Sequence, residues 1–345
     1  SSKKIAYFQK AIQTILEKKE TKYTLPSLEV IKNSGYQQDV LVYLVDLAFH
    51  FVETFKDTKD KSYLLKAKET LYRIDELVSL IRYESYTEQS KLFWIEKGVN
   101  SYMLAVEVCY LLNKPDEGFY FMEKNKALLL QENIKTFQAK LEMDIPKNIQ
   151  EQEYKLHYEL LAIEKKYQQN PNNSILKQNL DKKYKEFQKF MNSLSLKYPN
   201  YTKIKKQIEI ISLEKVLKTF KSNECFISYI LNKNDGYGIF GNSNEKIFFK
   251  INDIVSFQKN VNTLKGFVLK QVLDKKNVAI FQALSHEVFT ELFPFKNAIH
   301  KKKKKKIYII PDESLSNLPF EILTINPKFN LTKSYLINTT EISYL

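Results

Sequence analysis

The residues best suited to nucleophilic or acid–base chemistry are few and widely separated along the chain. The 345 residues include two cysteines, Cys109 and Cys225. A cysteine nucleophile needs a histidine within hydrogen-bond reach, or an electropositive helix start, to lower its pKa. Neither cysteine has a histidine nearby in sequence; Cys109 lies in an apolar helical pattern, and Cys225 opens a strand-like run. We therefore predict that both thiols are small buried core residues.

The four histidines lie in different segments. His50 sits among apolar residues of a helical pattern and is predicted to be a satisfied interface residue, whereas His157 belongs to a charged segment and is predicted to be solvated. His286 and His300 lie in the last third of the chain. Two cysteines and four scattered histidines lack the spacing of a disulfide framework or a closed zinc site, and no glycine-rich phosphate loop occurs. The sequence thus predicts no metal, no cofactor and no nucleotide hydrolase.

Two carboxylates near residues 310–320 are candidates for a site. Asp312 follows a strand-like run, and carboxylates at strand ends often line the sites of α/β proteins. The alternative is a turn, because Asp side chains bond the backbone two residues on and the sequence DES suits a helix start. We predict the turn for Asp312, and we expect Glu321 to bind a backbone donor rather than a substrate.

The positive charge of the chain comes almost entirely from lysine. The formal net charge is +14, and all but two of the 54 basic residues are lysines. Proteins that read bases or clamp phosphates favour the bidentate guanidinium of arginine, so nucleic-acid binding is a minor alternative. The run Lys301–Lys306 could attract nucleic acid or an anionic surface. We predict instead that it is a solvated loop or loop-to-strand junction, because like charges resist burial.

Neither a membrane segment nor a signal peptide is evident. The longest apolar candidate, residues 40–52, is interrupted by Asp46 and His50 and is amphipathic. The amino-terminal SSKKIAYFQKAIQTILEKK has helical periodicity and lacks the apolar core and cleavage site of a signal peptide. We therefore predict a cytoplasmic protein with no membrane segment.

The first 210 residues contain few glycines and are predicted to be helical. Apolar residues step by three or four through 40–55, 67–81 and 99–110, with short polar breaks between them, which predicts stacked antiparallel hairpins over residues 1–145. Residues 146–210 show near-heptad apolar spacing on both sides of NPNNS at 170–174. This pattern predicts an antiparallel coiled-coil hairpin.

From residue 211 the period changes to that of strands. The runs 224–231, 237–241 and 246–251 are β-rich and separated by turn sequences, which predicts an antiparallel meander. A helical stretch, 252–294, precedes the unbroken apolar run 307–311, which is typical of a strand inside a parallel sheet. The fold class predicted is α plus α/β, with helical hairpins followed by an α/β sandwich.

Several of these segments resemble one known family. The most specific are IYIIPDESLSNLPFEIL (307–323) and SYLINTTEISYL (334–345), together with SKLFWIEKGVNSYMLAVEVCYLLNKPDEGFYFMEKNKALLL (90–130). They resemble the bacterial TPR-CHAT proteins, in which tetratricopeptide-like repeats precede a caspase-like cysteine peptidase domain. The 307–345 segments look like that family's strand, Pro-Asp turn, Leu-Pro-Phe-Glu segment and next strand pair. The repeats depart from the 34-residue tetratricopeptide unit, and Gly118 stands where a small Ala is usual, so they are degenerate.

The resemblance implies a division into TPR-like repeats (1–145), a coiled-coil linker (146–210) and an incomplete amino-terminal part of the CHAT domain (211–345). The family places its catalytic histidine and cysteine after the strand pair ending in ISYL, so His286 and His300 precede that segment and no residue of this chain matches either group. The expected function is that of a regulatory, partner-binding portion of a cysteine peptidase, inactive by itself, with a protein partner on the helical surface. The alternative is an interaction scaffold with a vestigial protease-like domain.

Overall fold

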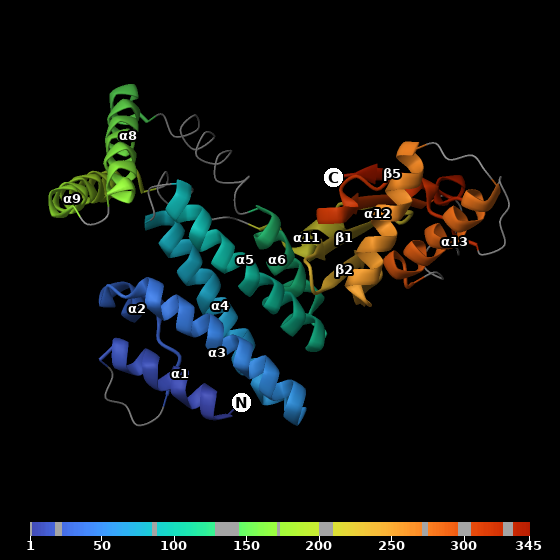
Figure 1. Ribbon diagram of the computed structural model, residues 1–345, viewed down its shortest axis with the longest axis horizontal. Helices are drawn as coiled ribbons and strands as arrows, with labels where there is room; N and C mark the ends of the chain where they lie inside the picture. The colour runs from blue at the N-terminus through green and yellow to red at the C-terminus, as the bar shows by residue number, and fades with distance from the viewer. Residues whose placement is uncertain are drawn as a thin grey trace. The chain divides into compact units, whose positions relative to one another are not determined.

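A computed structural model describes residues 2–17, 23–84, 88–127, 145–170, 173–199, 210–270, 275–295, 305–326 and 334–345 (Figure 1). The chain divides into two compact units. The helical unit comprises residues 1–108 and 123–210, and the α/β unit comprises residues 109–122 and 211–345. In the described part of the chain, no helix combines the length and the apolarity needed to cross a membrane.

The helical unit is built on two long helices joined by a tight turn. α3 (Gln37–Thr58) and α4 (Lys61–Glu84) are separated by two residues, and Lys59 adopts a left-handed conformation, φ 58°, while its N–H donates to the Phe55 carbonyl. Apolar residues at three- and four-residue steps bury one face of each helix, including Leu44 and Leu47 of α3 and Ile74 and Val78 of α4. The two helical segments predicted from periodicity are therefore confirmed.

The remaining helices of this region begin and end near the predicted breaks. They are α1 (Ser2–Ile15), α2 (Leu28–Ser34), α5 (Glu88–Leu111) and α6 (Pro115–Ala127). α1 packs on α3 through Phe8, whose ring lies 5.4 Å from His50 and 6.2 Å from Tyr43 between centroids. Both α5 and α6 contribute residues to each of the two units.

An antiparallel helical hairpin follows, formed by α8 (Lys147–Gln169) and α9 (Ser174–Lys197). Asn173 caps α9, because its side-chain oxygen accepts from the N–H groups of Ile175 and Leu176. Lys183 Nζ lies 2.7 Å from Glu159 Oε2, which shows that the helices run antiparallel well beyond the turn. Their shared buried residues are Leu156, Leu160, Phe187, Met191 and Leu194. These occupy positions of the predicted apolar pattern.

The α/β unit contains one five-stranded sheet in the order β3-β2-β1-β4-β5. Its strands are β1 (Glu224–Leu231), β2 (Gly236–Gly241), β3 (Lys246–Ile251), β4 (Lys305–Ile310) and β5 (Thr340–Tyr344). β1, β2 and β3 form the predicted antiparallel meander, and β4 lies parallel to both β1 and β5. The predicted buried parallel strand is thus confirmed.

One face of this sheet is covered by two helices. In sequence, α12 (Ile254–Lys270) and α13 (Lys275–Leu292) lie between β3 and β4. Ile227 and Tyr229 of β1 share one apolar cluster with Val261 of α12 and Phe289 of α13. The connections outside these helices contain α11 (Leu213–Lys218) and the 3-10 helices η1 (Glu313–Leu315), η2 (Phe320–Ile322) and η3 (Leu336–Asn338).

The second face of the sheet is contacted by residues from the end of α5 and the start of α6. Tyr110 packs against Tyr237 and Phe248, each at a centroid distance of 5.5 Å, and Phe119 lies edge-on to Phe226 at 5.6 Å. The α/β unit therefore includes a segment, 109–122, that the sequence pattern assigned to the helical repeats. The apolar period of a helix shows that one face is buried but not which neighbour buries it.

Two details of the carboxyl-terminal part differ from the prediction. β4 begins at Lys305 rather than at Ile307, so the last two residues of the lysine run belong to the strand, in agreement with the predicted loop-to-strand junction. The segment 334–345 forms one strand rather than a pair, because Tyr335 makes only an isolated bridge to Thr324 and η3 separates it from β5. Two backbone hydrogen bonds flank the bridge, from Ile325 N–H to the Ser334 carbonyl and from Leu336 N–H to the Leu323 carbonyl.

Candidate functional site

The carboxyl ends of the three parallel strands meet at one edge of the sheet. β1 ends at Leu231, β4 at Ile310 and β5 at Tyr344, and parallel pairing brings these ends together. Ligands of open α/β sheets bind at this edge. We therefore take the residues around these three strand ends, named here the carboxyl edge, as the candidate site.

Asp312 ties two strands together at the carboxyl edge. Its Oδ2 accepts a 2.8 Å hydrogen bond from the backbone N–H of Leu231, the last residue of β1. The side chain makes no capping bond to η1; that turn is closed by the Asp312 carbonyl, which accepts from Leu315 N–H. The predicted side-chain turn is therefore wrong, because the better donor comes from β1, a strand 81 residues away.

Glu321 and Tyr344 join the Leu-Pro-Phe-Glu segment to the last strand. The Tyr344 hydroxyl accepts from Phe320 N–H at 3.0 Å and donates to Glu321 Oε2 at 2.7 Å. Burial, and then the bond to Glu321, raise the pKa of the Tyr344 hydroxyl above its usual value. In these contacts the tyrosine oxygen, not the Glu321 carboxylate, binds the backbone donor. Glu321 accepts a hydrogen bond from the Tyr344 hydroxyl, and the sequence alone did not suggest this contact.

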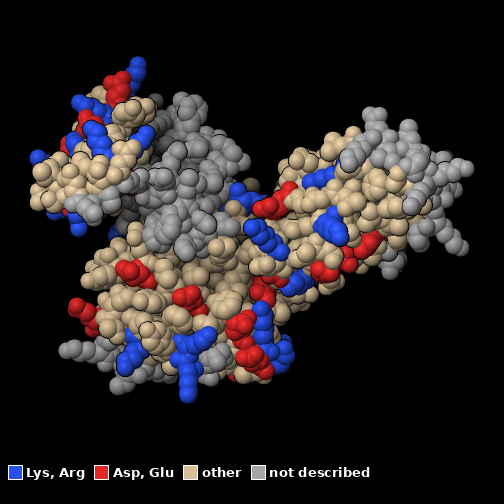
Figure 2. Space-filling view, viewed as in Figure 1, with Lys and Arg blue, Asp and Glu red and all other residues tan. Residues whose placement is uncertain are grey.

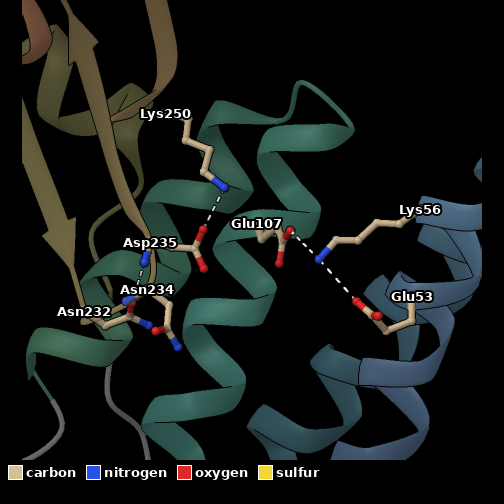
Figure 3. Close-up of polar contacts among 7 residues, drawn as sticks. All are labelled: Glu53, Lys56, Glu107, Asn232, Asn234, Asp235 and Lys250. Carbon is tan, nitrogen blue, oxygen red and sulfur yellow. Dashed lines mark hydrogen bonds and ion pairs between the residues drawn. The ribbon is translucent and has the colours of Figure 1, made fainter. Parts of the chain in front are cut away.

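The turn from β1 to β2 supplies the remaining polar groups near the end of β1. Asn232 Oδ1 accepts from the N–H groups of Asn234 and Asp235 at 2.8 and 2.7 Å, and the Asp235 carboxylate pairs with Lys250 Nζ at 2.6 Å (Figure 3). Gln258 of α12 donates to the Asn232 carbonyl. These bonds hold the turn predicted from NKNDG in place, and each of them joins two residues of this chain.

Neither cysteine lies at the carboxyl edge. Cys109 is fully buried, and Cys225 is 1% exposed with its Sγ 3.6 Å from the Lys306 carbonyl. The predicted burial of both thiols is confirmed. Cys225 stands near the amino end of β1, and five strand residues separate it from Leu231, a distance of about 20 Å. It is therefore remote from any chemistry at the carboxyl edge.

The described histidines occupy structural positions. His50 stacks on Phe8 between α1 and α3, as the interface prediction required. His157 is half-buried with its ring 6.1 Å from that of Phe187, so the prediction that it is solvated is wrong. The Nδ1 of His286 lies 2.9 Å from the Thr324 carbonyl, and the ring stacks on Phe289. His300 lies outside the described residues.

Most of the lysine run lies outside the described residues. Of the run Lys301–Lys306, only the last two residues are described, and Lys306 pairs with Glu341 Oε1 at 2.9 Å on the neighbouring strand β5. On the face drawn in Figure 2, lysine and arginine alternate with aspartate and glutamate over the described surface. The pairing with Glu341 offsets the charge of Lys306.

A buried charged group that the sequence did not single out lies in the helical unit. Asp75 of α4 accepts a 2.8 Å bond from the Tyr102 hydroxyl and lies 3.1 Å from Lys124 Nζ. The side chains of Asp75 and Lys124 are each 6% exposed. A buried ion pair needs such extra bonds to offset desolvation, and removing either partner is costly. The only sequence signal was an aspartate on the apolar face of a helix, beside Ile74.

The described residues provide no metal-binding cluster. Within the described ranges, no three His, Cys, Asp or Glu side chains are grouped so that they could hold a metal ion. Comparison of the sequence with protein-family models and with curated proteins finds no match.

Proposed function

We propose that residues 1–345 form the regulatory, partner-binding portion of a cytoplasmic caspase-clan cysteine peptidase of the TPR-CHAT type. The helical unit would bind the partner, and the α/β unit would be the amino-terminal part of the protease domain. The observation that carries the proposal is the carboxyl edge. There, three parallel strands flanked by helices end together, which is where peptidases of this clan hold their catalytic loops.

The chemistry available at the carboxyl edge supports a scaffold rather than a complete active site. The carboxylates of Asp312 and Glu321 are engaged with Leu231 and Tyr344, and both thiols are buried. Thiol catalysis requires a thiolate beside a base and open to the substrate. The proposal therefore takes the nucleophile and its histidine from sequence outside residues 1–345.

The helical unit supports the regulatory half of the proposal. Helical arrays present extended surfaces on which another protein can lie. A partner that binds one arrangement of the protein more tightly than another shifts the population toward that arrangement. Partner binding would in this way control the assembly of the catalytic groups or access to them.

Peptide cleavage by the complete gene product tests the proposal. Replacing a cysteine encoded downstream of Leu345 by serine should abolish cleavage of a peptide library, whereas Cys225→Ser should leave cleavage unchanged. Undiminished cleavage by the downstream variant would reject that residue as the nucleophile. A gene product without a downstream cysteine and histidine would favour the interaction scaffold with a vestigial protease-like domain.

A further inference from the structure

One face of α3 carries apolar and acidic side chains at heptad spacing, of which Asp39, Val42 and Phe49 are exposed while Asp46 and Glu53 are half-buried. Asp39, Val42, Asp46, Phe49 and Glu53 lie three or four residues apart and fall on one side of the helix, opposite the residues that pack on α4. Val42 is 43% exposed and Phe49 is 48% exposed, although both are large apolar residues. We call these five residues the α3 stripe.

Among the described residues, the contacts of the α3 stripe lie along its α1 side and at its carboxyl-terminal end. Phe49 meets the His50 ring edge-on at 5.5 Å, and His50 in turn stacks on Phe8 of α1. At the carboxyl-terminal end of the stripe, Lys56 pairs with Glu53 at 3.3 Å and with Glu107 of α5 at 3.2 Å (Figure 3). An aromatic contact thus borders the stripe on the α1 side, and an ion pair borders it at its far end.

The spacing of the α3 stripe indicates the shape of its occupant. Asp39, Asp46 and Glu53 repeat every seven residues, and Val42 and Phe49 repeat at the same interval between them. A seven-residue repeat is the pattern by which one helix packs along another. The stripe spans 15 residues, or about 21 Å of helix from the first to the last, which matches a partner helix of about four turns.

The charge of the α3 stripe indicates the composition of its occupant. Three carboxylates alternate with the two apolar residues, and because Lys56 pairs with Glu53, the negative charge of the stripe comes mainly from Asp39 and Asp46, in a chain whose net charge is +14. Such a surface attracts a positively charged partner and repels an acidic one. We propose that the α3 stripe docks a basic amphipathic helix of a protein partner, with apolar residues against Val42 and Phe49 and lysine or arginine against the carboxylates.

This inference rests on the proposed partner-binding function and names the chemistry of the partner. Binding can be measured by fluorescence anisotropy with the full 345-residue chain and three designed 18-residue peptides. The first is a basic amphipathic helix of Leu, Ala and Lys; the second has the same composition in shuffled order; the third has Glu in place of Lys. Only the first peptide should bind, and its affinity should fall with added salt.

Substitutions in the chain localise the binding. Asp46→Lys and Phe49→Ala should each weaken binding of the basic peptide by about tenfold or more. Two matched changes on α4, Glu69→Lys and Leu65→Ala, should alter it less than about twofold, because both residues are exposed and lie off the stripe. Circular dichroism of each variant checks that the helices remain folded.

Three results would overturn the inference. They are no binding of the basic peptide, equal binding of the acidic or shuffled peptide, and equal losses in the α3 and α4 variants. Self-association of the chain that Asp46→Lys abolishes would also overturn it, because the occupant would then be a second copy. If any of these occurs while cleavage by the gene product still depends on its downstream cysteine, the α3 assignment fails and the proposed function stands.

Discussion

His50 illustrates how one side chain at a helix contact couples stability to pH. Burial, and then the nearby charge of Lys4, lower its pKa below 6.5, although Asp46 and Glu53 oppose the shift. Between the pKa of the folded state and 6.5, the unfolded chain binds the proton more readily than the folded chain does. The neutral ring therefore contributes stability above pH 6.5 that is lost as the pH falls through the folded-state pKa.

We expect His50→Phe to remove this pH dependence while keeping an aromatic ring against Phe8. The free energy of unfolding of the wild-type chain, from urea titrations followed by helical circular dichroism, should fall on acidification below pH 6.5 by more than that of the variant. Parallel pH profiles for the two proteins would show that His50 does not titrate differently in the folded and unfolded states.

At the scale of single residues, burial was easier to predict than polar partners. The sequence indicated that Cys109 and Cys225 are core residues, because each lies in a local apolar pattern. It did not indicate the bond from Asp312 to Leu231 or the ion pair from Lys124 to Asp75, since both join residues far apart in the chain. A local pattern records which face of an element is buried, whereas a hydrogen-bond partner depends on how the chain folds back.

At the scale of elements, α6 shows why a residue can depart from a repeat pattern. The sequence identified Gly118 as unusual, and the structure supplies the reason. A Cβ at this position would lie 2.4 Å from Cε1 of Phe248 on β3, too close for the ring to stay in place. Lys246 of the same strand binds both oxygens of Asp116 at 2.7 and 2.9 Å. The glycine thus lets the start of α6 approach the sheet closely.

Gly118→Ala should destabilise the α/β unit by about 1–3 kcal/mol, because Phe248 must move within a packed face. Gly266→Ala is the matched control: this glycine also lies in a helix, but nothing stands within 4 Å of its added Cβ. The control should stabilise the chain by up to about 1 kcal/mol. Hydrogen exchange of the β2 and β3 amides measures the effect; equal protection in the two variants would contradict the role given to Gly118.

The elements themselves were largely predictable from their periods. The three strands of the meander begin and end within a residue of the runs read from the sequence, because alternating apolar residues and Asn-rich turns mark them locally. The second strand of the 334–345 segment does not form, and residues 109–122 pack on the sheet rather than only within the helical array. Both differences concern which element becomes the neighbour, and the period of a sequence carries no such information.

At the scale of the whole molecule, the two units differ in the features that bear on the proposed function. The helical unit has an exposed, patterned stripe on α3, and the α/β unit has a carboxyl edge whose polar groups bind one another. The proposed function gives partner binding to the helical unit and the framework for catalysis to the α/β unit. The net charge of +14 does not distinguish the two roles, since acidic and basic side chains are mixed over the described face (Figure 2).

The most direct test of the central claim is peptide cleavage by residues 1–345 themselves. We expect no cleavage of a peptide library. We also expect Cys109 and Cys225 to resist alkylation in the native chain but to react fully in urea, because both thiols are buried. Mass spectrometry reads both outcomes from one incubation. Cleavage of the library by this chain that is lost in Cys225→Ser, with rapid alkylation of that thiol under native conditions, would contradict the account.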